Sequence, residues 1–133
     1  MSIEPIYSSL KKILGQESLV CLGILFGSIV ENKQRFESDV DLAVAGERPL
    51  TNGEIKNLVE KLSVQLNRPI DLIDLHNTNG TLLHQVLTRG KLIYCDNRTL
   101  YAELIKKMLF NQADMMPYHD RILKERRERW ISE

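Results

Sequence analysis

Residues 39–45, DVDLAVA, alternate between two kinds of side chain, and no other segment constrains the fold as strongly. Successive side chains of a β-strand point to opposite faces of its sheet. One face of this strand would carry branched apolar side chains, those of Val40, Leu42 and Val44. The other face would carry Asp39, Asp41 and Ala43. The sequence therefore predicts a strand that is anchored in a core on one face and holds two carboxylates side by side on the other.

The segments around this strand alternate between helical and extended patterns. Helices are expected at residues 3–14, 51–67, 81–88 and from 98 onward, and further strands at 19–26, 69–75 and 91–95. Thr51 and Glu54 form a capping box at the start of the second helix. Gly15 and Gly90 suit helix C-termini. The order α-β-β-α-β-α-β-α predicts an α/β (α+β) fold with a small sheet flanked by helices.

The chain has 133 residues, 43% of them hydrophobic, and no Pro/Gly/Ser-rich linker divides it. We therefore expect one domain, with a core over 1–97 and a helical extension over 98–133 that packs on it and offers a possible partner-binding surface. Pro117 would break or kink that extension. The basic tail around Trp130 is either a solvated helix end or a partner-binding helix.

Charge and hydropathy exclude several classes of protein. Eighteen basic residues balance eighteen acidic ones, which argues against dedicated nucleic-acid binding. The longest apolar run, 19–26, is too short to span a bilayer, and the N-terminus has no segment of signal-peptide type. Cys21 and Cys95 lack ligand-spaced neighbours and are expected to be reduced thiols. These features predict a cytoplasmic protein with no membrane association.

Gly27-Ser28, directly after the first apolar run, is suited to binding phosphate. A glycine lets the backbone approach a ligand closely, and N–H groups exposed after it can bind phosphate oxygens. The Ser28 hydroxyl can add a hydrogen bond. The intervening residues, 29–38, are mostly polar and are expected to form a loop or one short helix. That connection would bring the two strands together, so that phosphate and the Asp39/Asp41 pair share one site.

A third carboxylate is expected from the strand at 69–75, where Asp71 and Asp74 face opposite sides if the strand is regular. Only one of them can join Asp39 and Asp41, and Asp71 is the better mid-strand candidate. Such carboxylates are the ligands that Mg²⁺ prefers, and a third could take a proton from an attacking hydroxyl. Two metal ions would stabilise the attacking and leaving oxygens of a displacement at phosphorus. The alternative is an ordinary turn followed by solvated acids.

These motifs resemble those of the minimal nucleotidyltransferases (MNT) of the DNA polymerase β-like superfamily, and most closely the MntA antitoxins of HEPN–MNT toxin–antitoxin pairs. The resemblance covers about residues 1–100. It is carried by three segments: 25–28 (LFGS), 38–44 (SDVDLAV) and 69–75 (PIDLIDL).

The resemblance implies a small mixed sheet, ATP as substrate and Mg²⁺ as cofactor. It implies transfer of AMP from ATP to a tyrosine of a HEPN RNase toxin, with which the chain would form a stable hetero-oligomer. Gly27 and Ser28 would hold the triphosphate. The metal ligands would be Asp39, Asp41 and Asp71, with Asp71 nearest the attacking oxygen.

The segment after Ser28 departs from the pattern of many relatives, because no basic residue follows directly. The nearest ones are Lys33 and Arg35. Two other functions are compatible with the motifs. The chain could be a non-catalytic antitoxin that occludes its toxin, or a nucleotidyltransferase that modifies a small molecule or a nucleic acid 3′ end. The second usually needs a further domain to hold the acceptor, so a partner protein is the favoured acceptor.

Overall fold

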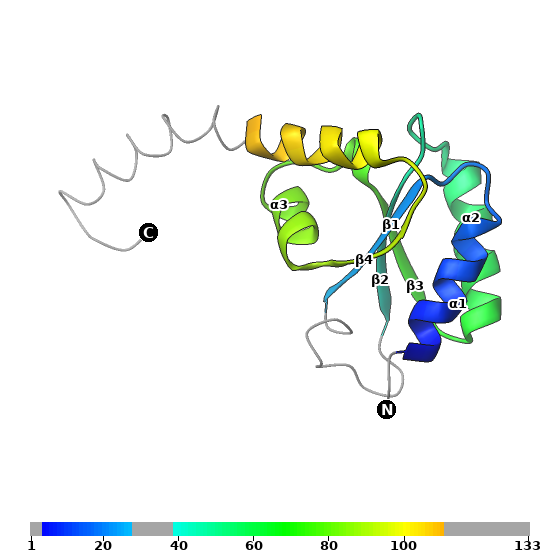
Figure 1. The fold of residues 1–133 in the computed structure, drawn as a ribbon. Helices are drawn as coiled ribbons and strands as arrows, with labels where there is room; N and C mark the ends of the chain where they lie inside the picture. The colour runs from blue at the N-terminus through cyan, green and yellow to red at the C-terminus, as the bar shows by residue number, and fades with distance from the viewer. Residues whose placement is uncertain (1–3, 28–38, 111–133) are drawn as a thin grey trace, which may run out of the picture.

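The computed structural model describes residues 4–27 and 39–110. Its elements are α1 (Glu4–Gly15), β1 (Leu22–Phe26), β2 (Val40–Ala45), α2 (Asn52–Leu66), β3 (Ile70–Asp74), the short 3-10 helix η2 (Leu75–Asn77), α3 (Gly80–Arg89) and β4 (Lys91–Cys95). Residues 98–110 form one further helix, yellow to orange in Figure 1. The predicted order of helices and strands is confirmed over these residues.

The four strands form one mixed sheet in the order β3-β2-β1-β4. β1 runs antiparallel to both of its neighbours, whereas β2 and β3 are parallel and are connected through α2. The register aligns Phe26, Asp41 and Asp71 across three adjacent strands. The predicted small mixed sheet flanked by helices is therefore confirmed, and its register brings the acidic segments of β2 and β3 together.

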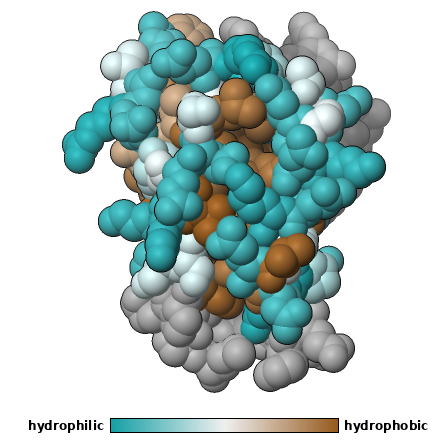
Figure 2. All heavy atoms as spheres, turned by 90° about the vertical axis from the view of Figure 1, so that its right-hand side faces the viewer, coloured by the Kyte–Doolittle hydropathy of each residue, from teal (hydrophilic) through white to brown (hydrophobic). Residues whose placement is uncertain are grey.

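The first face of the sheet packs against α1 and α2, which lie side by side in Figure 1. The apolar side chains of β2 that were predicted to face a core are fully buried here: Val40, Leu42 and Val44. Leu58 and Leu62 of α2 pack on this first core, as do Leu10 and Leu14 of α1. Figure 2, which looks onto this side of the molecule, shows mainly hydrophilic side chains with apolar atoms in a few places.

The second face of the sheet packs against α3 and the helix over 98–110. Ala43 and Ala45 of β2 are fully buried on this face, next to Leu83 and Val86 of α3. The residues of the last helix that pack on this second core are Leu100, Tyr101, Leu104 and Met108. Since Asp41 precedes Ala43 by two residues, its side chain belongs to this second face.

The predicted helix ends are present, but the glycine at the end of α3, Gly90, is required by lack of space and not by its backbone conformation. Thr51 and Glu54 form the reciprocal capping box at the start of α2. Gly90 follows α3 with an ordinary φ of −72°, so no left-handed conformation requires a glycine there. Space requires it instead, because a Cβ atom would lie 2.5 Å from Ile24 Cγ2 and 3.1 Å from the Leu25 carbonyl oxygen. The end of α3 therefore sits directly on β1.

The first strand is shorter than predicted. Residues 19–21 belong to the connection after α1, where the Val20 N–H donates to the Glu17 carbonyl in a turn. Cys21 is buried and Cys95 half-buried, and both are free thiols. Within 4–27 and 39–110, no helix is long and apolar enough to cross a bilayer. Residues 28–38, Pro117 and Trp130 lie outside the described part of the chain.

Candidate active site

Asp41 and Asp71 lie next to each other at one end of the sheet. The parallel register of β2 and β3 pairs them directly, and the charge of Asp71 acts on the Asp41 carboxyl group. Asp71 is exposed on the edge strand β3, whereas Asp41 is half-buried on the inner strand β2. β2 and β3 therefore present these two acids on the same face of the sheet.

The carboxyl group of Asp41 has an unusually high pKa. Burial is the main cause, followed by the charge of Asp71, the hydrogen bond to Asp71 and the charge of Asp39, and together they raise the pKa from 3.8 to about 6. A carboxylate that is desolvated beside like charges is stabilised by a proton or a cation. The electrostatics at Asp41 thus favour binding of a positive ion.

Gly27 directly follows the neighbouring strand β1 and packs against the Asp41 carboxyl group. Its φ of +80° lies in the left-handed region that favours glycine. A Cβ atom built on Gly27 would collide with Asp41 Oδ2 and would lie 2.9 Å from Asp41 Cγ. The Asp41 carboxyl group therefore occupies the space that a side chain at position 27 would need. Sequence reasoning assigned Gly27 to phosphate binding alone and missed this contact.

Asp39 directly precedes β2 and is exposed. Its charge acts on Asp41, so Asp41 is affected by both of the other predicted acids. Among the residues that the structure describes, no group of three or more His, Cys, Asp or Glu side chains has a geometry that could hold a metal ion. The chemistry of the donors nevertheless suits Mg²⁺, which usually takes one or two protein carboxylates and completes its shell with substrate phosphates and water. Ser28 lies outside the described residues.

Asp74 is separated from this cluster because its side chain faces the other way. It is 5% exposed, and its two oxygens accept hydrogen bonds from the Leu50 N–H at 2.8 Å and the His76 N–H at 2.9 Å. The His76 ring is engaged as well, with Nε2 2.6 Å from the Gly46 carbonyl oxygen. Asp74 and His76 thus fix the far end of β3 to the loop after β2. The structure brings Asp71, and not Asp74, beside Asp41.

The sequence that forms this acid pair beside a left-handed glycine matches a known family. A family model described as "Polymerase beta, Nucleotidyltransferase" matches residues 8–99. The chain belongs to this polymerase beta nucleotidyltransferase family. The match includes β1, β2 and β3 and therefore every candidate site residue of this family member.

Individual relatives agree with the family assignment. The protein adenylyltransferase MntA of Shewanella oneidensis is 37% identical over 70 residues, which are 53% of this chain and 50% of that protein. The aligned stretch thus spans half the length of this curated relative.

Solved structures extend the likeness to the fold. A crystal structure of a toxin–antitoxin with AMP-PNP is 28% identical with a TM-score of 0.68, and the match covers 87% of this chain and 97% of that chain. A tri-AMPylated Shewanella oneidensis HEPN toxin in complex with its MNT antitoxin gives 26% identity and a TM-score of 0.66, with 91% and 98% covered.

Proposed function

We propose that this family member is an antitoxin that transfers AMP from ATP to a tyrosine of a HEPN RNase toxin. The observation that carries the proposal is the Asp41–Asp71 pair, with Gly27 packed against Asp41 at the end of the adjacent strand. Occlusion of a toxin needs no such carboxyl cluster. The curated relative is named a protein adenylyltransferase, and the HEPN toxin in one similar structure is tri-AMPylated.

In the proposed reaction, the tyrosine oxygen attacks the α-phosphorus of ATP, and diphosphate leaves from the opposite side. Asp39, Asp41 and Asp71 would hold Mg²⁺, and Gly27 and Ser28 would hold the triphosphate. The metal, when bound, neutralises charge on the phosphates and on the leaving oxygen. Asp71 would accept the proton of the tyrosine hydroxyl, which makes it the acid nearest the new oxygen–phosphorus bond.

The unequal exposure of the two acids supports this division of roles. Asp71 is exposed on an edge strand, so a side chain from another protein can reach it without entering a pocket. Asp41 is half-buried and has a pKa near 6, which suits a group that faces a cation rather than a large acceptor. The site therefore suits a protein acceptor better than a small molecule that a pocket would have to enclose.

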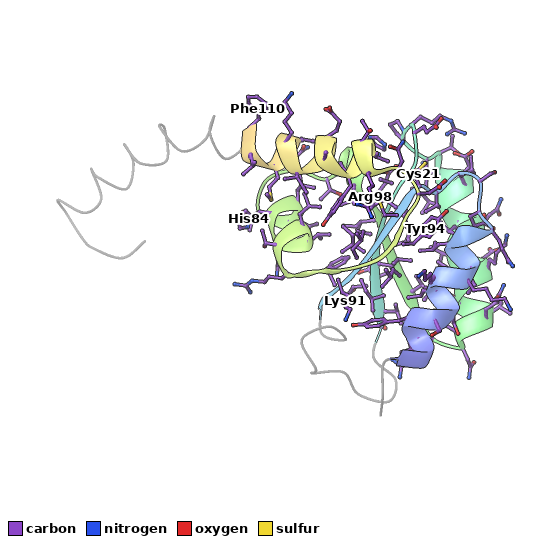
Figure 3. The ribbon with its side chains drawn as sticks, in the orientation of Figure 1. Cys21, His84, Lys91, Tyr94, Arg98 and Phe110 are labelled. Carbon is purple, nitrogen blue, oxygen red and sulfur yellow. The ribbon has the colours of Figure 1, made fainter. Side chains whose placement is uncertain are left out.

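The proposed partner is the toxin itself, in a stable hetero-oligomer in the cytoplasm. The last described helix carries two large apolar side chains near its end, Leu109 at 54% and Phe110 at 55% exposed. Figure 3 shows Phe110 at the end of that helix farthest from the sheet. Exposed apolar side chains of this size are typical of protein interfaces, so the helix over 98–110 is the proposed contact.

The test is incubation of the protein with toxin, Mg²⁺ and ATP labelled at the α-phosphate. Label should move to the toxin, and it should be lost with chelator or with the double variant Asp39→Asn, Asp41→Asn. The matched control is Asp96→Asn, which removes an exposed carboxylate just after β4. Label transfer that survives in the double variant would refute the site. Neutralisation without label transfer would favour occlusion, and transfer to an antibiotic by the isolated chain would favour a small-molecule acceptor.

A further inference from the structure

The sheet order arranges the site residues in a row along one end of the sheet. Asp71 on β3 comes first, Asp41 on β2 second, and Gly27 at the end of β1 third. The fourth position in this row is the start of β4, because Lys91 pairs with Leu25 two residues before Gly27. The chain reaches that position through the end of α3, so 89–91 lie beside the end of β1 that leads into Gly27.

Gly90 brings the end of α3 especially close to β1. A Cβ atom there would lie 3.1 Å from the Leu25 carbonyl oxygen and 2.5 Å from Ile24 Cγ2. The absence of a side chain therefore lets the last turn of α3 rest on the strand that leads into Gly27. The backbone of Arg89, the residue before Gly90, is consequently held close to the part of β1 that leads into Gly27.

The two basic residues that flank Gly90 differ in their surroundings. Lys91 faces the first core, where its Nζ lies 4.9 Å from the centre of the Tyr7 ring of α1 in a cation–π contact (Figure 3). Arg89 belongs to α3, which covers the second face, the face that carries Asp41. Arg89 is exposed, and within the described residues its guanidinium forms no ion pair or hydrogen bond.

We propose that Arg89 binds the terminal phosphates of the nucleoside triphosphate. This inference rests on the proposed function and supplies the basic contact that the sequence lacks directly after Ser28. Asp71 and Asp41 lie at the opposite end of the row, so a triphosphate held there by its α-phosphate would extend across Gly27 toward the end of α3 and Arg89. A guanidinium donates two parallel hydrogen bonds to phosphate oxygens, and such charge-assisted contacts are strong.

The test compares two substitutions in the same segment, Arg89→Gln and Lys91→Gln. Affinities for Mg²⁺·AMP-PNP and for AMP are measured by calorimetry with the full chain. Loss of one charge-assisted phosphate contact should weaken binding of AMP-PNP by about tenfold or more. AMP lacks the terminal phosphates, so its affinity should not change. Lys91→Gln should change both affinities by less than about twofold, since Tyr7 holds that side chain on the other face.

A cation in the last turn of a helix also interacts with the helix dipole, so thermal unfolding is followed for each variant. Arg89→Lys retains the charge and should recover part of the AMP-PNP affinity. Unchanged AMP-PNP affinity in Arg89→Gln overturns the inference, as does an equal loss for AMP or an equal loss in Lys91→Gln. If the unsubstituted protein neither binds AMP-PNP nor transfers label, the proposed function fails instead. The two failures are therefore distinguishable.

Discussion

Replacing Gly27 with alanine tests the contact on which the geometry of the site depends. The φ of +80° alone disfavours an L-residue by about 1–2 kcal/mol. The new Cβ atom also collides with the Asp41 carboxyl group, which must leave its rotamer at a cost of about 1 kcal/mol. We expect a total loss of about 2–3 kcal/mol in the free energy of unfolding.

Gly80 provides a matched control for this substitution. Its φ of +61° is also left-handed, but no atom lies within 4 Å of where its Cβ would be. Gly80→Ala should therefore show the backbone cost without the collision, about 1–2 kcal/mol. Urea denaturation of both variants measures the difference between them.

A double-mutant cycle assigns that difference to Asp41. In an Asp41→Ala background, Gly27→Ala should cost only slightly more than Gly80→Ala, because the carboxyl group is gone and only the Cβ atom of residue 41, at 3.2 Å, remains in the way. Label transfer to the toxin should fall by about a hundredfold or more in Gly27→Ala, since a shift of one ångström in a reacting group has effects of that size. An equal cost of Gly27→Ala in both backgrounds would refute the proposed contact.

Three further predictions follow from the acids and from the exposed helix end. Without metal, the free energy of unfolding should fall by about 1 kcal/mol as the pH rises from 4 to 6, because the folded chain still holds an Asp41 proton that the unfolded chain has released. Urea denaturation at several pH values measures this loss, and the Asp41→Asn variant should not show it. Asp74→Ala should lower the free energy of unfolding by about 2–3 kcal/mol, since it leaves two backbone N–H donors without their acceptor. Asp71→Ala should leave urea denaturation nearly unchanged but abolish label transfer to the toxin. Phe110→Ser should weaken toxin binding by about tenfold, as measured by calorimetry. The control is Val64→Ser on α2, where the valine side chain is 80% exposed, and it should leave toxin binding unchanged. Equal effects of the two substitutions would argue against the proposed contact.

The alternation of side chains in 39–45 was sufficient to predict both faces of β2. Only an extended chain buries Val40 and Ala43 on opposite sides, and both are fully buried. The same period predicted that only one of Asp71 and Asp74 could join the other acids, because residues three apart in a strand face opposite sides, and the mid-strand position favoured Asp71. Local periodicity thus predicted the faces of β2 and β3, whereas the direct pairing of Asp41 with Asp71 is seen only in the structure.

What the sequence did not predict depends on contacts between distant segments. Nothing local indicates that Gly27 leaves room for Asp41 or that Gly90 leaves room for β1, since these contacts join neighbouring strands and a helix end. The start of β1 was also predicted too early. Residues 19–21 are as apolar as the strand itself, and only the turn at Val20 shows that they belong to the connection. Contacts between distant segments account for the two glycines, and a local turn accounts for the start of β1.

The parallel pairing of β2 with β3 has a consequence for the timing of activity. Two parallel strands cannot be joined by a tight turn, so the segment that forms α2 must cross over for Asp41 to meet Asp71. Non-local closure of this kind is among the slower steps of folding. A newly made chain therefore gains its acid pair only when β3 has docked, and an antitoxin of the proposed kind disarms its partner only after that delay.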